Sequence, residues 1–184
     1  MATNKDEARF RDLHDRYQAR ILAYCLRRAP GSDAADAAAE TFLVAWRRIG
    51  EIPAGEQALV WLYGVARRVL ANNRRSLGRR RRLQDRLSGL PVDVMPAVDT
   101  LVIRKDESQE LVAALGRLRR ADQEVLRLVA WEELPRTDIA RILGCSRDAV
   151  DHRFHRAIRR LSDQLKGSNA HHSTSTTLTE GAAS

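Results

Sequence analysis

Residues 136–151 read RTDIARILGCSRDAVD, and the spacing of this stretch predicts two helices joined by a tight turn, a helix-turn-helix. Gly144 falls at the expected end of the first helix, where the backbone needs a positive φ that glycine adopts at little cost. Ala140 lies four residues earlier, where the helices cross and only a small side chain fits. Val150 follows six residues later, inside the angle between the helices. These offsets are the ones that the geometry of the motif requires.

Two caps and two helix faces extend this prediction. Thr137 is expected to cap the first helix and Ser146 the second. The first helix would turn Ile139, Ile142 and Leu143 inward. The second helix has the period of a buried face, with a stripe of Val150, Phe154, Ala157, Leu161 and Leu165. Its opposite face has the charge and shape to enter the major groove of DNA, and it consists of Arg147, Asp151, His152, His155, Arg156 and Arg159.

Helical periodicity also runs through the N-terminal part of the chain. The first apolar stripe, which Pro30-Gly31 ends, consists of Phe10, Leu13, Tyr17, Ile21 and Tyr24. Ser32 is expected to cap a second helix, whose stripe is Ala35, Ala39, Phe42, Trp46 and Ile49. A third stripe follows the breakers Gly50 and Pro53 and consists of Leu59, Leu62, Ala66, Val69 and Leu70. No strand-like alternation persists, so the expected fold class is all-α.

Charge and turn residues divide the chain into four parts. Residues 1–78 form one small helical domain, and residues 106–166 form a second domain that contains the helix-turn-helix. A flexible basic linker is expected at 79–105, because it begins with the run from Arg79 to Arg82 and then gathers two prolines and a glycine. The tail, 167–184, is polar, small and aperiodic, and it is expected to be disordered.

The composition favours a polyanionic partner. The 184 residues include 32 Lys and Arg against 24 Asp and Glu, which gives a net charge of +8. Most of these cations are Arg, whose planar fork of donors suits phosphates and guanine edges. No apolar run approaches the ~20 residues of a membrane span, and no signal peptide is recognisable. Cys25 and Cys145 give neither a disulfide framework nor a zinc pattern. A soluble cytoplasmic protein is expected.

Three stretches together resemble one family. They are DAADAAAETFLVAWRRIG at 33–50, WLYGVARRVLANNRRS at 61–76, and ALGRLRRADQEVLRLVAWEELPRTDIARILGCSRDAVDHRFHRAIRRL at 114–161. Their order and separation resemble those of bacterial sigma-70 family sigma factors of the extracytoplasmic-function (ECF) group, over about residues 8–166. The resemblance implies a transcription initiation factor and not an enzyme. Such a factor binds core RNA polymerase, directs it to specific −35/−10 promoters and assists promoter melting.

The resemblance implies that the second helix of the N-terminal domain docks on the clamp helices of the largest polymerase subunit. The matching positions are Asp36, Glu40, Thr41, Phe42, Val44, Trp46 and Arg47. An aromatic side chain beside charges is a reasonable interface anchor. Phe42 and Trp46 also lie on the apolar stripe of their helix, however, so core packing explains these two residues equally well.

The third helix is implied to contact the −10 element and to help melt it. Its candidate residues are Trp61, Tyr63, Arg67, Arg68, Asn72, Asn73, Arg74 and Arg75. Aromatic rings interleaved with Arg suit single-stranded DNA, because bases stack on rings while cations follow phosphates. The preceding loop, Gly50 to Ala58, would capture an unstacked base. Trp61 fits a core position equally well, and Arg68 departs from the Asn that is common in the family.

The helix-turn-helix is implied to read the −35 element. By match to the family, Asp151, His152, His155 and Arg156 face the bases, whereas Arg147 and Arg153 touch phosphates. Asp151 has three interpretations that the sequence leaves open. Its carboxylate could accept from a cytosine amino group or orient an Arg, or it could simply respond to the helix dipole.

The implied partners are core RNA polymerase, through its clamp helices and beta flap, promoter DNA and an anti-sigma factor. No membrane, metal or cofactor is expected. Two other classes of function stay open. One is a stand-alone helix-turn-helix regulator that acts without polymerase. The other is a metal-dependent nucleic-acid enzyme, since Asp33, Asp36 and Glu40 share a helix face, but no catalytic motif accompanies them.

Overall fold

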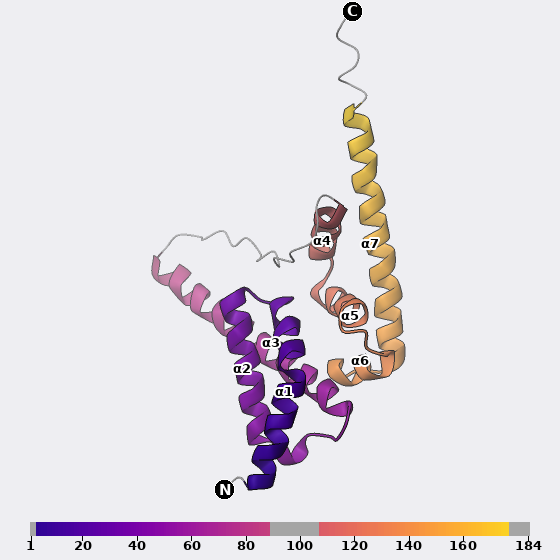
Figure 1. The fold of residues 1–184 in the computed structure, drawn as a ribbon. Helices are drawn as coiled ribbons and strands as arrows, with labels where there is room; N and C mark the ends of the chain where they lie inside the picture. The colour runs from indigo at the N-terminus through magenta and orange to yellow at the C-terminus, as the bar shows by residue number, and fades with distance from the viewer. Residues whose placement is uncertain (1–2, 89–106, 177–184) are drawn as a thin grey trace, which may run out of the picture. The chain divides into compact units, whose positions relative to one another are not determined.

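The computed structural model describes residues 3–88 and 107–176, and these ranges are helical apart from short connections (Figure 1). No strand occurs within them, so the all-α prediction is confirmed. The chain divides into two compact units. The first contains α1, α2, the short 3-10 helix η1 and α3, and the second contains α4, α5, α7 and most of α6. None of the helices in the described ranges is long and apolar enough to span a membrane.

Three helices build the first unit. Helix α1 (Asn4–Leu26) starts at a capping box in which Thr3 and Asp6 satisfy each other's backbone N–H groups. Helix α2 (Gly31–Arg47) lies beside it in Figure 1, and η1 (Ile49–Glu51) leads to α3 (Gln57–Ser88), which packs on both. The predicted stripe of α1 is largely confirmed, since Leu13, Tyr17, Ile21 and Tyr24 are buried and Phe10 is half-buried. All five predicted apolar residues of α3 are buried.

Two predictions for α2 are wrong. The helix begins at Gly31, and its cap is Pro30, whose carbonyl accepts from Ala34 N at 2.8 Å. Ser32 therefore lies inside the first turn and caps nothing. The buried face is also rotated, because Ala35 and Ala39 are exposed. The buried side chains are instead Ala34, Ala37, Ala38, Thr41, Phe42 and Ala45. Because alanine lies on several sides of α2, α1 and α3 can pack against a face other than the predicted one.

The predicted linker begins too early. Helix α3 continues to Ser88 through the run from Arg79 to Arg82. Arg, Leu and Gln are good helix formers, and Gly78 alone does not end a helix that already has about six turns behind it. The remainder of the predicted linker, residues 89–105, lies outside the described residues.

The described residues of the second unit form α4 (Glu107–Arg117), α5 (Arg120–Ala130), most of α6 (Arg136–Leu143) and α7 (Arg147–Thr176). Its core gathers Leu115, Leu118, Leu126 and Ala157, with Trp131, Phe154 and Leu161 packed against them. The predicted disordered tail at 167–184 is wrong in its first part, because α7 continues to Thr176. The stretch holds no proline that would stop a helix already under way. Residues 177–184 lie outside the described residues.

Candidate functional site

The turn between α6 and α7 has the predicted geometry. Gly144 has a φ of +66°, and Cys145 N donates to Ala140 O at 3.1 Å, which closes the end of α6. Ser146 caps α7, because its Oγ accepts from Ala149 N at 3.2 Å. A side chain at position 144 would meet no neighbour within 4 Å, so space does not require glycine there. The positive φ does, because residues with a side chain rarely adopt it. The predictions for Gly144 and Ser146 are confirmed.

The cap of α6 differs from the prediction. The helix begins at Arg136, and the carbonyl of Pro135 accepts from Asp138 N at 3.0 Å and from Ile139 N at 3.1 Å. Thr137 therefore lies in the first turn and is exposed. A proline before the helix fixes the entry of the chain and supplies the accepting carbonyl, so that no hydroxyl is needed.

The buried residues of the motif hold α6 and α7 in place. Ile139 and Val150 are fully buried, and Ala140 and Ile142 are nearly so. On α7, Ala157 is buried, and Phe154, Leu161 and Leu165 are half-buried. This side of α7 is thereby fixed, and the opposite side is left for a partner.

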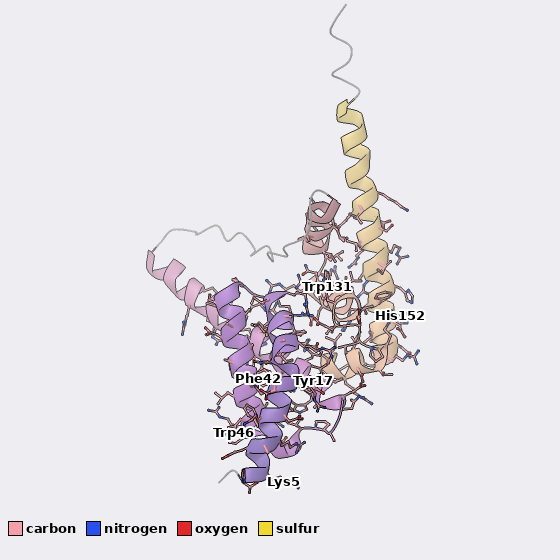
Figure 2. The ribbon with its side chains drawn as sticks, viewed as in Figure 1. Lys5, Tyr17, Phe42, Trp46, Trp131 and His152 are labelled. Atoms are coloured by element: carbon pink, nitrogen blue, oxygen red, sulfur yellow. The ribbon has the colours of Figure 1, made fainter. Side chains whose placement is uncertain are left out.

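The outer face of α7 carries two histidines at its centre. His152 and His155 are both exposed, and His152 lies at the outer surface of the helix (Figure 2). Exposed Arg147, Arg156 and Arg159 surround them, whereas Arg153 is half-buried and directs Nη1 toward the Cys145 sulfur at 3.9 Å. A neutral imidazole both donates and accepts hydrogen bonds, so this face can address base edges as well as phosphates.

One flank of this face is held by Asp151. Its carboxylate pairs with Arg136 Nε at 3.3 Å and with Arg147 Nε at 3.6 Å. The Arg136 guanidinium also lies over the Phe154 ring, 3.6 Å from its centroid. Asp151 therefore joins the first residues of α6 and α7. Of its three interpretations, these contacts favour the orientation of an Arg.

The other flank is held by a residue that the sequence analysis missed. Asp122 in the first turn of α5 is buried, and it pairs with Arg160 Nη1 at 2.8 Å and Arg156 Nη2 at 3.4 Å. The available signal was the spacing of Arg156 and Arg160, which places two cations on one side of α7. An acidic residue among the apolar positions of α5 completes that signal.

The residues of α2 with a predicted role in polymerase docking separate into two groups. Asp36, Glu40 and Arg47 are exposed. Thr41 and Phe42 are buried, and the Thr41 hydroxyl donates to Ala37 O at 2.7 Å. The prediction of a surface contact is therefore wrong for Thr41, because its hydroxyl is directed into the backbone of its own helix.

An aromatic cluster joins α1 to α2. Phe10 lies 5.2 Å from Trp46, and His14 lies 4.8 Å from Phe42, both ring to ring and edge to face. These rings, with Leu43, line an open groove of about 760 Å³. Leu43 is 47% exposed at its edge. Phe42 and Trp46, which Figure 2 labels, thus pack in this cluster and also border a surface that a partner can reach.

The residues of α3 with a predicted role at the −10 element also separate. Tyr63 is buried, with its ring 5.0 Å from that of Tyr24, so the prediction that it stacks on DNA is wrong. Trp61 is half-buried, and the Arg48 guanidinium lies 5.9 Å from its ring centroid. Arg67 is half-buried. The exposed members are Arg68, Asn72, Arg74 and Arg75.

The loop before α3 is tied down at three points. Arg9 of α1 donates to Ile52 O, and the Tyr17 hydroxyl donates to Gly55 O at 3.5 Å. Gly55 has a φ of +63°. Near the start of the loop, Glu51 accepts from Arg48 Nε at 3.0 Å, and this bond lowers the pKa of the Glu51 carboxyl. The loop therefore has a defined shape beside the start of α3.

No cluster in the described ranges suits a metal ion. Across residues 3–88 and 107–176, no three His, Cys, Asp or Glu side chains gather as ligands, and this includes Asp33, Asp36 and Glu40. Cys25 is buried, Cys145 is half-buried, and neither forms a disulfide.

Comparison with known proteins finds two family matches. The model of sigma-70 region 2 matches residues 13–80, and that of sigma-70 region 4 matches residues 108–161. One similar protein is the RNA polymerase sigma factor NccH of Alcaligenes xylosoxydans xylosoxydans, 29% identical over 91% of this chain and 92% of the relative. Another is the RNA polymerase sigma factor YlaC of Bacillus subtilis, 30% identical over 79% and 86%. A third is the ECF RNA polymerase sigma factor BldN of Streptomyces coelicolor, 30% identical over 85% and 60%.

Two solved structures share the fold. The sigma factor RpoE in complex with the anti-sigma factor NepR, from Bartonella quintana, has a TM-score of 0.67 and 23% identity and covers 85% of this chain and 96% of its own. CnrH in complex with the cytosolic domain of CnrY has a TM-score of 0.57 and 22% identity and covers 86% and 88%.

Proposed function

Because the chain belongs to the sigma-70 family of RNA polymerase sigma factors, within its ECF group, we propose that the two units described above divide promoter recognition between them. The second unit reads the −35 element through α7. The first unit docks on the polymerase through α2 and contacts the −10 element through α3. The chain is thus a transcription initiation factor that binds core RNA polymerase and directs it to promoters.

The observation that carries the −35 assignment is the exposed face of α7. His152 and His155 lie at its centre and are proposed to contact base edges, since imidazole nitrogens can donate or accept there. Arg147 and Arg153 lie near the start of the helix and are proposed to contact phosphates, which fix the protein on the duplex. Asp151 is proposed to orient Arg147, because it already pairs with that residue in the free protein.

For the polymerase surface, we propose Asp36, Glu40 and Arg47 with the exposed edge of the aromatic groove. The three charges lie on the exposed side of α2, and Leu43 and Trp46 lie beside them. An apolar anchor surrounded by charged residues is the common composition of a protein interface. The partner surface is the clamp helices of the largest subunit, as the family resemblance implies.

For the −10 element, we propose Trp61, Arg67, Arg68, Asn72, Arg74 and Arg75. The four exposed members are spread over two turns of α3, which suits a strand whose phosphates pass along the helix. Trp61 keeps part of its ring accessible for a base. The tethered loop, Gly50 to Ala58, is proposed to receive the unstacked base.

We also propose that an anti-sigma factor covers these surfaces and that the protein acts in the cytoplasm without catalysing a reaction of its own. The similar structures of RpoE and CnrH were determined with NepR and with the cytosolic domain of CnrY respectively. A stand-alone regulator has less support, because residues 13–80 match a region that such a regulator does not need.

The deciding experiment is in vitro transcription with the purified protein and bacterial core polymerase on fragmented genomic DNA. We expect discrete transcript starts that share −35 and −10 elements and that vanish when the protein is left out. His152→Ala and His155→Ala should then lower transcription from the native −35 element more than from a scrambled one. Tight binding to duplex DNA without any protein-dependent start would instead support the stand-alone regulator.

A further inference from the structure

Asp122 is a charged residue in an unusual place. It is 1% exposed, and the role in polymerase docking or promoter contact assigned above does not use it. Its two carboxylate oxygens are divided between two cations, with Arg160 Nη1 at 2.8 Å and Arg156 Nη2 at 3.4 Å. A buried carboxylate without partners would be strongly destabilising, so these two Arg side chains are what allow Asp122 to be there.

The two Arg side chains link Asp122 to the reading helix. Arg156 and Arg160 are four residues apart on α7 and therefore share one side of the helix. Arg156 also follows His152 by four residues, so this side borders the exposed face. The Arg side chains are 45% and 38% exposed, which leaves each half in solvent while its tip is held from below by α5. The pair thus fixes how far α7 is rotated about its own axis.

Rotation of α7 matters because base contacts tolerate little displacement. With side chains, a helix has a radius of about 6 Å, so a turn of about 20° moves a side-chain tip by about 2 Å. A hydrogen bond to a base edge is lost over that distance. Small changes at Asp122 would therefore be felt at His152 and His155.

We propose that Asp122 is a positioning residue for −35 recognition. It sets the rotation of α7 through Arg160, and it holds the Arg156 guanidinium so that this cation does not take whichever phosphate is nearest. This inference rests on the proposed role of α7 at the −35 element. It also moves Arg156 from the residues expected to face bases to the residues that hold the reading helix in place.

The proposal has a specific consequence for Asp122→Asn. The amide removes the charge that neutralises two guanidinium groups, so both become free to contact phosphates. Each added phosphate contact makes the dependence of log K on log salt steeper by about 0.9. Affinity for any DNA should therefore rise at low salt, while discrimination in favour of the correct −35 element falls.

The test uses the full chain assembled with core polymerase. Two promoter fragments are compared, one identified by the transcription mapping above and one with the same −10 element but a scrambled −35 element. The ratio of the two affinities is measured at several salt concentrations. We expect Asp122→Asn to lower this ratio by about tenfold, the effect of roughly one lost base contact, and to steepen the salt dependence. Asp163→Asn is the matched control, because Asp163 is an exposed carboxylate of α7 in the same unit, and it should keep the wild-type ratio.

The salt dependence separates positioning from mere loss of stability. A variant whose second unit only unfolds also loses the preference for the −35 element, but it gains no phosphate contacts, so its salt dependence does not steepen. Hydrogen exchange on α4 to α7 checks directly that the second unit stays folded. Arg160→Gln provides a second test if Asp122→Asn does not fold, because Asp122 then keeps Arg156 as a partner, and its ratio should also fall. A wild-type ratio in the variant that folds would overturn the proposal. If the wild-type protein itself does not discriminate between the fragments, the proposed −35 function fails instead.

Discussion

At the scale of single residues, two neighbours on α2 have opposite surroundings. Glu40 is exposed, whereas Thr41 is fully buried with its hydroxyl bonded to Ala37 O. We expect Thr41→Val to lower the free energy of unfolding by about 1 kcal/mol, the net value of a typical hydrogen bond, and to leave affinity for core polymerase unchanged. Glu40→Ala should instead lower affinity for core polymerase and leave the free energy of unfolding unchanged. Chemical denaturation and a polymerase-binding titration measure the two effects.

The control for this pair is Asp12→Ala, which removes an exposed carboxylate of α1 that pairs with Arg16, one turn away, at 3.2 Å. It should change neither quantity appreciably, since such surface pairs contribute little. A loss of polymerase affinity in Thr41→Val, without loss of stability, would return Thr41 to the interface.

A second residue-scale prediction concerns the carboxyl of Asp6. Hydrogen bonds from the backbone N–H and the hydroxyl of Thr3 lower its pKa below the ordinary 3.8. Since the folded pKa is the lower one, this carboxylate stabilises the protein at pH values above 3.8, and the contribution is lost as the pH falls through the folded pKa. We expect an NMR titration of Thr3→Ala to show the Asp6 pKa raised only part of the way, because the backbone N–H remains. Thr3→Ser keeps a hydroxyl and should titrate as the wild type does.

At the scale of elements, the sequence predicted what depends on strict spacing. The offsets of Ala140, Gly144 and Val150 have no other simple explanation, and α6, the turn and α7 are where they place them. The buried face of α2 was not predictable in the same way, because an alanine-rich helix offers several nearly equivalent faces. Tyr63 was predicted to contact DNA because Arg residues lie near it in the sequence. Its place on α3 between the buried residues Leu62 and Val65 directs it to the core instead. Asp122 was hidden because its partners lie more than thirty positions away.

Ser146 and Ser32 were both expected to cap helices, and the structure distinguishes them. Ser146 bonds Ala149 N, whereas Ser32 makes no capping bond. We therefore expect Ser146→Ala to reduce the stability of the second unit by about 1 kcal/mol, and Ser32→Ala to reduce that of the first by almost nothing. Site-resolved hydrogen exchange at the starts of α7 and α2 measures each effect separately. An unchanged stability of the second unit in Ser146→Ala would mean that this bond contributes nothing.

At the scale of the whole molecule, each unit has a hydrophobic core of its own. Ile21 is fully buried in the first unit, and Leu128 is fully buried in the second. Replacing either residue with alanine should lower the free energy of unfolding by about 2–5 kcal/mol. This is a large part of the 5–15 kcal/mol that stabilises a typical domain. The stability of this protein is therefore better described by two numbers than by one.

Leu128→Ala and Ile21→Ala are a matched pair that tests this independence. We expect Leu128→Ala to lose amide protection in the second unit while α1, α2 and α3 keep theirs, and Ile21→Ala to give the mirror image. In function, Leu128→Ala should still bind core polymerase but lose the preference for a −35 element, because docking is proposed for α2 and −35 reading for α7. Hydrogen exchange followed by mass spectrometry, with a polymerase-binding assay alongside, measures both. If either variant loses protection in both units together, they unfold as one cooperative body, and the assignment of separate tasks would have to be tested within that single body.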